Sequence, residues 1–257
     1  MRTRILLTHS ALEHFKIRGA NGSRLEGFSD GIFSLAVAIL LLTTNVPKNF
    51  NELWTFVKDV VPFFLCIGFV YLIWIQHVVF FARYGLQDEK TSKLNMMLLF
   101  CVLFYVYPLK FLLTMATKSL FVFAMFLLGD PASAAELSSL NTMIGMDKIP
   151  MLMAIYGAGF GAVFYLFYRL YRHAQELGDV LGLTPMEYWE TVFSARFTRA
   201  MALTAFISVA IALLGVAFRF PIVSFFSGMA YNYLWIYKAS HTRSWKKKKE
   251  ELAMQAA

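Results

Sequence analysis

The chain alternates long apolar segments with short polar ones. A membrane-spanning helix needs about 20 mostly apolar residues, and six segments reach that length, at about residues 25 to 46, 57 to 82, 94 to 116, 150 to 172, 200 to 218 and 220 to 238. Pro221 separates the last two, which we expect to form a tight hairpin because proline breaks a helix. The pattern predicts an all-α membrane protein, with six transmembrane helices in a single domain that covers residues 1–257.

The sequence also bears on two further helix boundaries. The third segment stays apolar as far as Leu128, so its helix either stops near residue 116 or continues beyond the bilayer. Thr184, Pro185 and Glu187 have the spacing of a capping box, with a hydroxyl at the N-cap, proline at the first helical position and glutamate at the third. This pattern predicts a short cytoplasmic helix ahead of the fifth span.

Composition and charge support a membrane location. The chain is 58% hydrophobic and 16% charged, whereas an ordinary soluble domain is roughly 45–50% apolar and about 25% charged. Most of the 24 Lys and Arg residues lie in the N-terminal segment, after the second and fourth spans, and in the C-terminal tail. Because the cytoplasmic side retains basic residues, we expect both termini of this multi-pass cell-membrane protein to be cytoplasmic, with a short N-terminal tail and a basic C-terminal tail. The partners predicted from this placement are membrane lipids, not nucleic acid.

Asp30 is an ionisable residue well inside the first span. A central Asp costs about 2.5–3.5 kcal/mol to insert, so such residues face protein or water and find a partner. Asp30 has two candidates at matching depth, His77 in the second span and Asn95 in the third, all within about 10 Å of the inner surface. We therefore predict a polar network between these helices.

The start of the first span carries a short polar motif. It reads Arg-x-x-x-Phe-Ser-Asp and consists of Arg24, Phe28, Ser29 and Asp30. This arrangement resembles the prokaryotic branch of the transmembrane protein 175 family of endolysosomal potassium channels. Trp74 and His77 in the second span and Asn95 in the third are similar to polar anchor positions of that family, and the likeness extends over all six predicted spans.

The resemblance implies a function and an assembly. Animal members of the family carry two six-span repeats, whereas this chain has one Phe-Ser-Asp motif and no second copy in its latter half. The resemblance therefore implies a potassium-conducting homotetramer, in which four first helices surround one pore and the Phe-Ser-Asp cluster ties helices together. It implies no cofactor, and no metal beyond permeant monovalent cations.

The helical period places the candidate pore residues on one stripe. With about 100° per residue, Leu35, Ala38 and Leu42 share a face that points away from Ser29 and Asp30. Rings of leucine in the tetramer would exclude water and impede ions until they widen, and we expect Leu35 to form the tightest ring. Relatives often have threonine where this chain has Ala38, so we predict reduced selectivity for potassium over sodium.

Missing motifs narrow the function further. The chain has no Thr-Val-Gly-Tyr-Gly filter and no span with arginine at every third position, which argues against a conventional potassium-channel pore and an intrinsic voltage sensor. It has no catalytic motif, so we predict that it is not an enzyme. The leading interpretation is a passive, potassium-preferring cation channel. The alternative is a proton-coupled membrane transporter that uses Asp30 and His77 as a relay.

Overall fold

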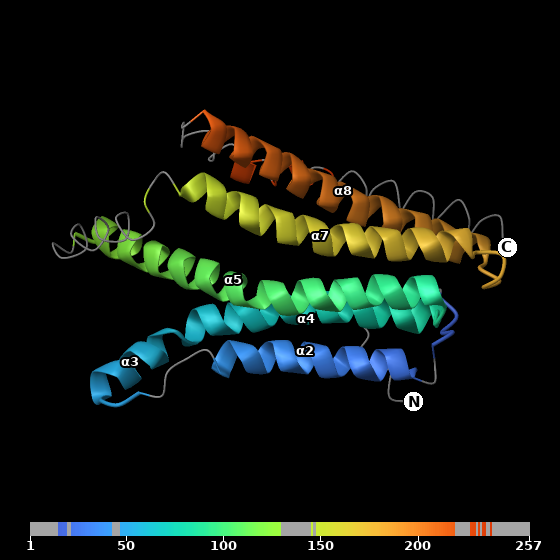
Figure 1. Ribbon diagram of the computed structural model, residues 1–257, viewed down its shortest axis with the longest axis horizontal. Coiled ribbons are helices and arrows are strands. Elements are labelled where there is room, and N and C mark those ends of the chain that lie inside the picture. Colours follow the sequence, from blue (N-terminus) through green and yellow to red (C-terminus); the bar gives the residue numbers. More distant parts are fainter. Residues whose placement is uncertain are drawn as a thin grey trace.

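The protein is all-helical over the residues that the computed structural model describes, which are 15–19, 22–42, 47–129, 145, 148–218, 227–229, 231, 233–234 and 237. The helices are α2 (Arg24–Leu42), α3 (Phe50–Lys58), α4 (Val60–Tyr84), α5 (Glu89–Leu127), α7 (Ile149–Glu176) and α8 (Pro185–Ala217). The five long helices run nearly side by side, with α2 and α4 on one side of α5 and α7 and α8 on the other (Figure 1).

Four of these helices, α4, α5, α7 and α8, are long and apolar enough to cross a membrane. α2 is not one of the four, because it carries Arg24, Glu26 and Asp30 near its start, but its 19 residues give it a length of about 28 Å. Most of the predicted sixth span, residues 220 to 238, lies outside the described residues. The all-helical fold class is confirmed, and the number of six spans stays a prediction.

Three helix boundaries differ from the predicted ones. The expectation of a separate short helix ahead of the fifth span is wrong, because residues from Pro185 onward form one continuous helix, α8, of 33 residues. The third predicted span continues to Leu127 as α5, which resolves its open outer end. The second span starts only at Val60, because residues 50–58 form a separate amphipathic helix, α3. α5 and α8 are therefore about 58 and 50 Å long, well beyond the roughly 30 Å of bilayer hydrocarbon.

Local signals fix the helix ends. Gly85 ends α4 in the left-handed conformation, with φ of 59°, and its N–H donates to the Phe81 carbonyl over 2.8 Å. The predicted capping box of Thr184 and Glu187 is confirmed at the start of α8. Asp88 caps α5 by accepting from the N–H groups of its first turn, and it also contacts His173.

The Asp88 cap is ionised at neutral pH. Partial burial acts to raise the pKa of its carboxyl, but the hydrogen bonds from Thr91 and His173 outweigh burial and hold the pKa below its usual range. The cap therefore links the start of α5 to the end of α7 at one end of the bundle.

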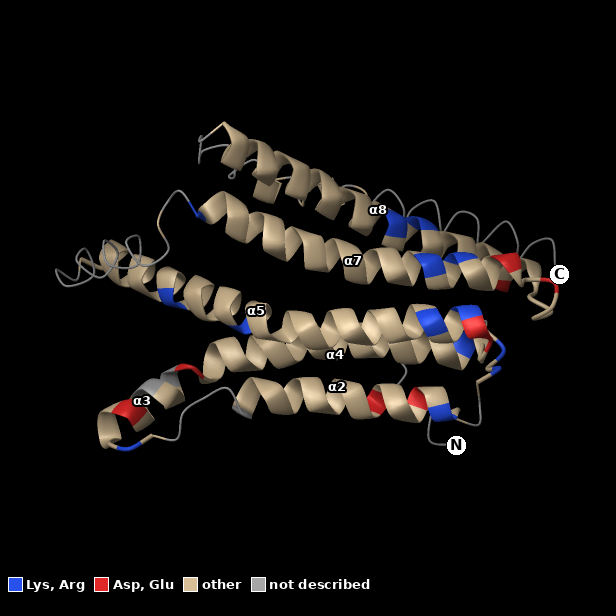
Figure 2. Ribbon diagram, in the orientation of Figure 1, with Lys and Arg blue, Asp and Glu red and all other residues tan. Residues whose placement is uncertain are grey.

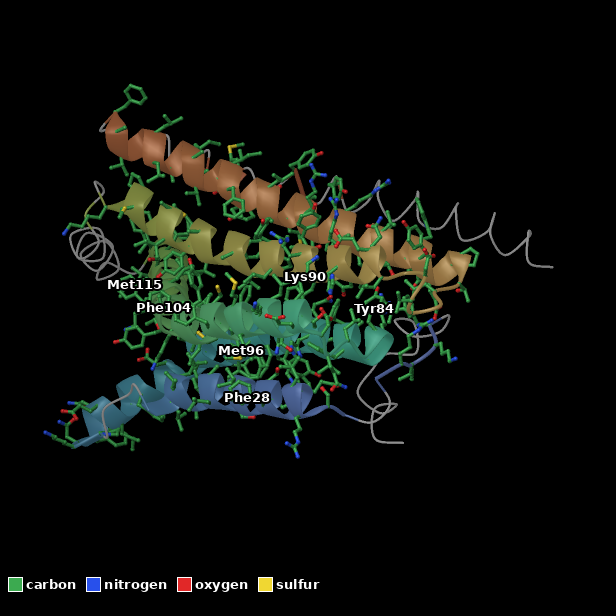
Figure 3. All side chains as sticks on the ribbon, turned by 45° about the vertical axis from the view of Figure 1, so that its right-hand side comes forward. Phe28, Tyr84, Lys90, Met96, Phe104 and Met115 are labelled. Carbon is green, nitrogen blue, oxygen red and sulfur yellow. The ribbon has the colours of Figure 1, made fainter. Side chains whose placement is uncertain are left out.

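The main core lies between α2, α4, α5 and α7. Phe33, Phe80, Leu98 and Leu170 are among its buried members, and Tyr84 closes it at the end of α4. Outside this core the helices expose many large apolar side chains. Met96 and Phe104 on α5 are examples of such exposed side chains (Figure 3). A surface of this kind is suited to lipid, as expected for a multi-pass membrane protein.

The segment ahead of α2 is held against both halves of the bundle. The N–H groups of Arg18 and Gly19 donate to the Ala82 carbonyl at the end of α4. The Arg18 guanidinium forms two hydrogen bonds with the buried Glu187 carboxylate at the start of α8, of 3.0 and 2.8 Å. The same carboxylate accepts from the Lys16 N–H. Glu187 therefore caps its own helix and also fixes the N-terminal segment.

Charged residues gather at one end of the bundle. Basic residues of α2, α4, α5, α7 and α8 lie toward the end where α2, α5 and α8 begin (Figure 2). At the opposite end, where α5 ends and α7 begins, the described basic residues include Lys118 and Lys148. The basic residues that the sequence concentrates between certain spans therefore gather at one end of the folded bundle.

Candidate pore helix and its anchoring network

α2 starts at a reciprocal capping pair. The Ser23 hydroxyl accepts from the Glu26 N–H over 3.1 Å, and the Glu26 carboxylate accepts from the Ser23 N–H over 3.0 Å. The Ser-x-x-Glu spacing of a capping box is visible in the sequence, although our prediction did not use it. Glu26, an acidic residue near the end of a span, is thus a structural cap for the helix.

One face of α2 is buried against α4 and α5. Ser29, Phe33, Ala36 and Leu40 recur every three to four residues and are all buried. This spacing is that of a single helical face. The packing therefore fixes the rotation of α2 about its own axis and decides which residues point elsewhere.

A chain of hydrogen bonds runs from α4 through α5 to this face. Asn95 lies in the middle, with its Oδ1 2.8 Å from Nε2 of His77 and its Nδ2 2.9 Å from the Ser29 hydroxyl. The Ser29 hydroxyl in turn donates to the Leu25 carbonyl over 2.7 Å. Ser29, His77 and Asn95 are all fully buried. The predicted polar network between the three helices is therefore present.

The donor and the acceptor of each hydrogen bond in this network can be assigned. An amide oxygen only accepts, so Nε2 of His77 must carry the hydrogen that it shares with Asn95. The His77 ring is also held between Phe33 of α2 and Phe81 of α4, with ring centroids 5.4 and 4.6 Å apart. This imidazole is therefore a closely packed hydrogen-bond donor within the helix bundle.

The structure corrects the predicted partners of Asp30. Its Oδ1 accepts from the indole Nε1 of Trp74 over 2.8 Å, and it is Ser29 that reaches Asn95 and His77. Among the described residues, no hydrogen bond or ion pair joins Asp30 to His77. Trp74, which we predicted as an anchor through the family resemblance, is therefore the direct partner of the carboxylate. Within the described part of the chain, the hydrogen bonds of Asp30 and His77 therefore lead to different partners, Trp74 and Asn95.

A second face of α2 is bare in the single chain. Phe28, Leu35 and Ala38 are exposed, and a Cβ added at Gly31 would have no neighbouring atom within 4 Å. Figure 3 shows Phe28 on this helix. Arg24 is also exposed. The side chain of Leu42 lies outside the described residues, although its backbone belongs to α2. The structure thus brings Ser29, Asp30, Trp74, His77 and Asn95 into contacts between helices, and leaves Arg24 and Phe28 on the surface.

Lys110 holds the other end of α2. Its ammonium donates to the Leu40 carbonyl over 2.8 Å, which is one of the four carbonyls in the last turn of the helix. α2 has no basic residue in its own last turn, so this cation from α5 complements the negative end of the helix dipole. The sequence shows Lys110 as an isolated charge in the third span but does not indicate which carbonyl it contacts.

The described residues contain no group of three or more His, Cys, Asp or Glu side chains arranged to hold a metal ion. Together with the fold, the anchored and half-bare α2 defines the class as an all-helical, multi-pass membrane protein.

The comparisons with known proteins agree. Residues 24–105 match the model of the family described as "Endosomal/lysosomal potassium channel TMEM175". A curated protein of Marivirga tractuosa named "Potassium channel" is 35% identical over 201 residues, which are 78% of each chain. This chain belongs to the TMEM175 family of potassium channels, as the resemblance predicted. The family is one of ion channels and not of enzymes.

Two further relatives show how far the likeness extends. The crystal structure of a T38A variant of the potassium channel MtTMEM175, in complex with a nanobody–MBP fusion protein, covers 90% of this chain and 97% of its own, with 33% identity and a TM-score of 0.74. The potassium channel B446_29190 of Streptomyces collinus is 30% identical over 94 residues, 33% of this chain and 44% of that protein. The matched range 24–105 contains the whole network around Asn95.

Proposed function

We propose that this chain is one subunit of a homotetrameric, potassium-preferring cation channel, in which four copies of α2 surround the pore. The observation that carries the proposal is the division of α2 into a buried face and a bare stripe. Ser29 and Phe33 lie on the buried face, and Leu35 and Ala38 on the bare stripe. A helix held in this way presents the same residues to a central axis in every copy. The named channels among its relatives supply the expected ion, potassium.

The pore of this tetramer is apolar. Leu35 forms its narrowest ring and Leu42 a second one further along the helix, with Ala38 between them. A narrow ring of leucines sheds water, so ions pass only when it widens, and the channel gates by dewetting. Transport is passive and needs no cofactor besides the permeant monovalent cations.

The orientation in the cell membrane follows from the charged end of the bundle. Because basic residues are retained on the cytoplasmic side, the end with Arg83, Lys90 and Arg172 faces the cytoplasm, and so do both termini. The bare stripe of α2 then lies in the membrane, with Asp30 near its inner side, where the carboxylate faces protein or water and not lipid.

Single-channel recording from purified, reconstituted protein tests the pore assignment. Leu35→Ala should give a wider or leakier pore, seen as higher unitary conductance or constant opening. The matched control is Leu41→Ala, since Leu41 lies on the same helix with 51% of its surface exposed against 45% for Leu35, but points about 120° away. Equal effects of the two substitutions, or none from either, would contradict the assignment.

Proton coupling separates the channel from the transporter. Potassium flux into proteoliposomes should follow the potassium gradient alone, with the same initial rate whether or not a pH gradient is imposed. A flux that requires the pH gradient would favour the transporter, despite the separate partners that the structure gives to Asp30 and His77.

A further inference from the structure

A polar cavity of about 700 Å³ opens between the end of α7 and the first half of α8. Tyr168 and Arg172 line it from α7, and Tyr188, Arg196 and Arg199 line it from α8. None of these residues belongs to the α2 network or to its bare stripe. We call this site the arginine cavity.

The arginine cavity has an excess of positive charge. Its lining contains three arginines and two acidic residues, Glu176 and Asp179. The Glu176 carboxylate is already compensated, because it lies 2.9 Å from the Lys90 ammonium and 3.5 Å from the Arg172 guanidinium. In the described part of the chain, no ion pair involves Arg196 or Arg199, and both are exposed. Among the described residues, these two guanidinium groups are therefore not paired with a carboxylate, and both act on the Tyr237 hydroxyl.

The two arginines are held on one face of α8. Arg196 and Arg199 are three residues apart and so lie one above the other on the helix. The guanidinium of Arg196 lies 5.9 Å from the centre of the Trp189 ring, a cation–π contact that restricts its position. Guanidinium groups bind phosphate through paired, charge-assisted hydrogen bonds, and the hydroxyls of Tyr168 and Tyr188 add neutral donors at the wall of the cavity.

The position of the cavity along the helices indicates which kind of phosphate compound it can reach. Arg199 directly precedes the apolar residues 200–217 of α8, and Arg172 lies four residues after Tyr168, which ends the uncharged run of α7. The cavity therefore lies at the level where the bilayer hydrocarbon ends, at the basic end of the bundle (Figure 2). Tyrosine is typical of this interfacial layer, and basic pockets between transmembrane helices at this level bind anionic headgroups.

We propose that the arginine cavity binds the phosphate of an anionic membrane phospholipid. Arg196 and Arg199 contact the phosphate, Arg172 and the two tyrosines complete the site, and the acyl chains lie along the apolar surface of α8. A zwitterionic lipid is a weaker ligand, because its cationic headgroup offsets the attraction of the arginines. This site is separate from ion conduction, so its test does not depend on the proposed function.

Native mass spectrometry of the delipidated full-length protein tests the proposal. The protein is titrated with phosphatidylglycerol and with phosphatidylcholine of the same acyl chains. The wild type should bind one phosphatidylglycerol per subunit, about tenfold or more tightly than phosphatidylcholine, and Arg196→Gln with Arg199→Gln should lower that affinity by about tenfold or more. The matched control is Lys93→Gln with Arg169→Gln, which removes two positive charges from the same end but outside the cavity.

Three results would overturn the proposal. One is equal binding of the two lipids, and another is an equal loss of affinity in both double variants. The third is full competition by glycerol 3-phosphate at the lipid's own concentration, which would assign the site to a soluble phosphate compound. If the double variant does not elute as folded protein, Arg199→Gln alone is measured, and an unchanged affinity for phosphatidylglycerol contradicts the proposal.

Discussion

At the scale of single residues, Asn95 connects the three helices around the candidate pore. Sequence depth alone predicted that His77 and Asn95 lie beside the start of α2, and the structure places them there. Depth did not reveal that Ser29, and not Asp30, is their partner. Neighbouring residues on a helix point about 100° apart, so the choice between Ser29 and Asp30 depends on the rotation of α2, which the packing of Phe33 and the rest of its buried face decides.

Replacing Asn95 by alanine should destabilise the protein. The substitution leaves the His77 Nε2–H buried without an acceptor, at a cost of about 1–3 kcal/mol. The Ser29 hydroxyl loses the hydrogen bond that it accepts from Asn95 but keeps its bond to the Leu25 carbonyl. Thermal unfolding of the purified protein in detergent measures the effect. Thr117→Val is the matched control, because the Thr117 hydroxyl donates to the Leu113 and Thr114 carbonyls of its own helix α5 and joins no two helices within the described residues. Equal melting temperatures for the two variants would show that the buried chain of hydrogen bonds contributes little.

A hydroxyl at position 38 should change ion selectivity. Ala38 lies on the bare stripe of α2, so Ala38→Thr adds an oxygen that meets permeating cations in the proposed pore. One hydrogen-bonding group contributes about 0.5–1.5 kcal/mol, and we expect the permeability ratio of potassium to sodium to rise about two- to tenfold. Reversal potentials under bi-ionic conditions measure the ratio. Leu41→Thr places the same group on another face, and an equal rise in that variant, or none in Ala38→Thr, contradicts the prediction.

At the scale of elements, apolar length predicted where helices occur better than where they end. α5 and α8 continue beyond the predicted spans, because neither proline nor glycine interrupts the chain from residue 109 to 128 or from 186 to 214. Hydropathy also did not separate α3 from α4, since both are rich in large apolar residues. The start of α3 does have a local signal, which our prediction did not use. Asn49 and Glu52 form a reciprocal cap there.

The end of α2 depends on a residue of another element. Lys110→Met should loosen the last turn of α2, because the Leu40 carbonyl loses its cationic donor. We expect a loss of about 0.5–2 kcal/mol, measured as faster amide hydrogen exchange confined to residues 39–42. Lys118→Met, on the same helix but half exposed and 3.8 Å from Asp59, serves as control. Uniformly faster exchange along α2 in the Lys110 variant would mean that the whole helix had shifted and not its end alone.

At the scale of the whole molecule, the N-terminal segment joins the two halves of the bundle. It lies against the end of α4 and, through Arg18 and Glu187, against the start of α8. The sequence predicted the capping role of Glu187 but not this contact, because the partners are 169 residues apart and nothing local relates them. If α8 moves relative to α4, either this ion pair breaks or the N-terminal segment moves with α8.

The ion pair of Arg18 and Glu187 should contribute far more to stability than an exposed pair. Their side chains are 12% and 1% exposed, so removing one partner leaves a charge with little water around it, at a cost of about 3–5 kcal/mol. In a double-mutant cycle on the free energy of unfolding in mixed micelles, Arg18→Met and Glu187→Gln should each destabilise strongly. The second substitution should cost clearly less once the first is made, because only the other hydrogen bonds of that residue remain to be lost. The pair of Lys93 and Glu89, with side chains 73% and 82% exposed, is the control and should show a coupling below about 1 kcal/mol. If the two cycles gave the same small coupling, the contact would not hold the halves together, and the order of the N-terminal segment would have to come from its backbone hydrogen bonds to Ala82.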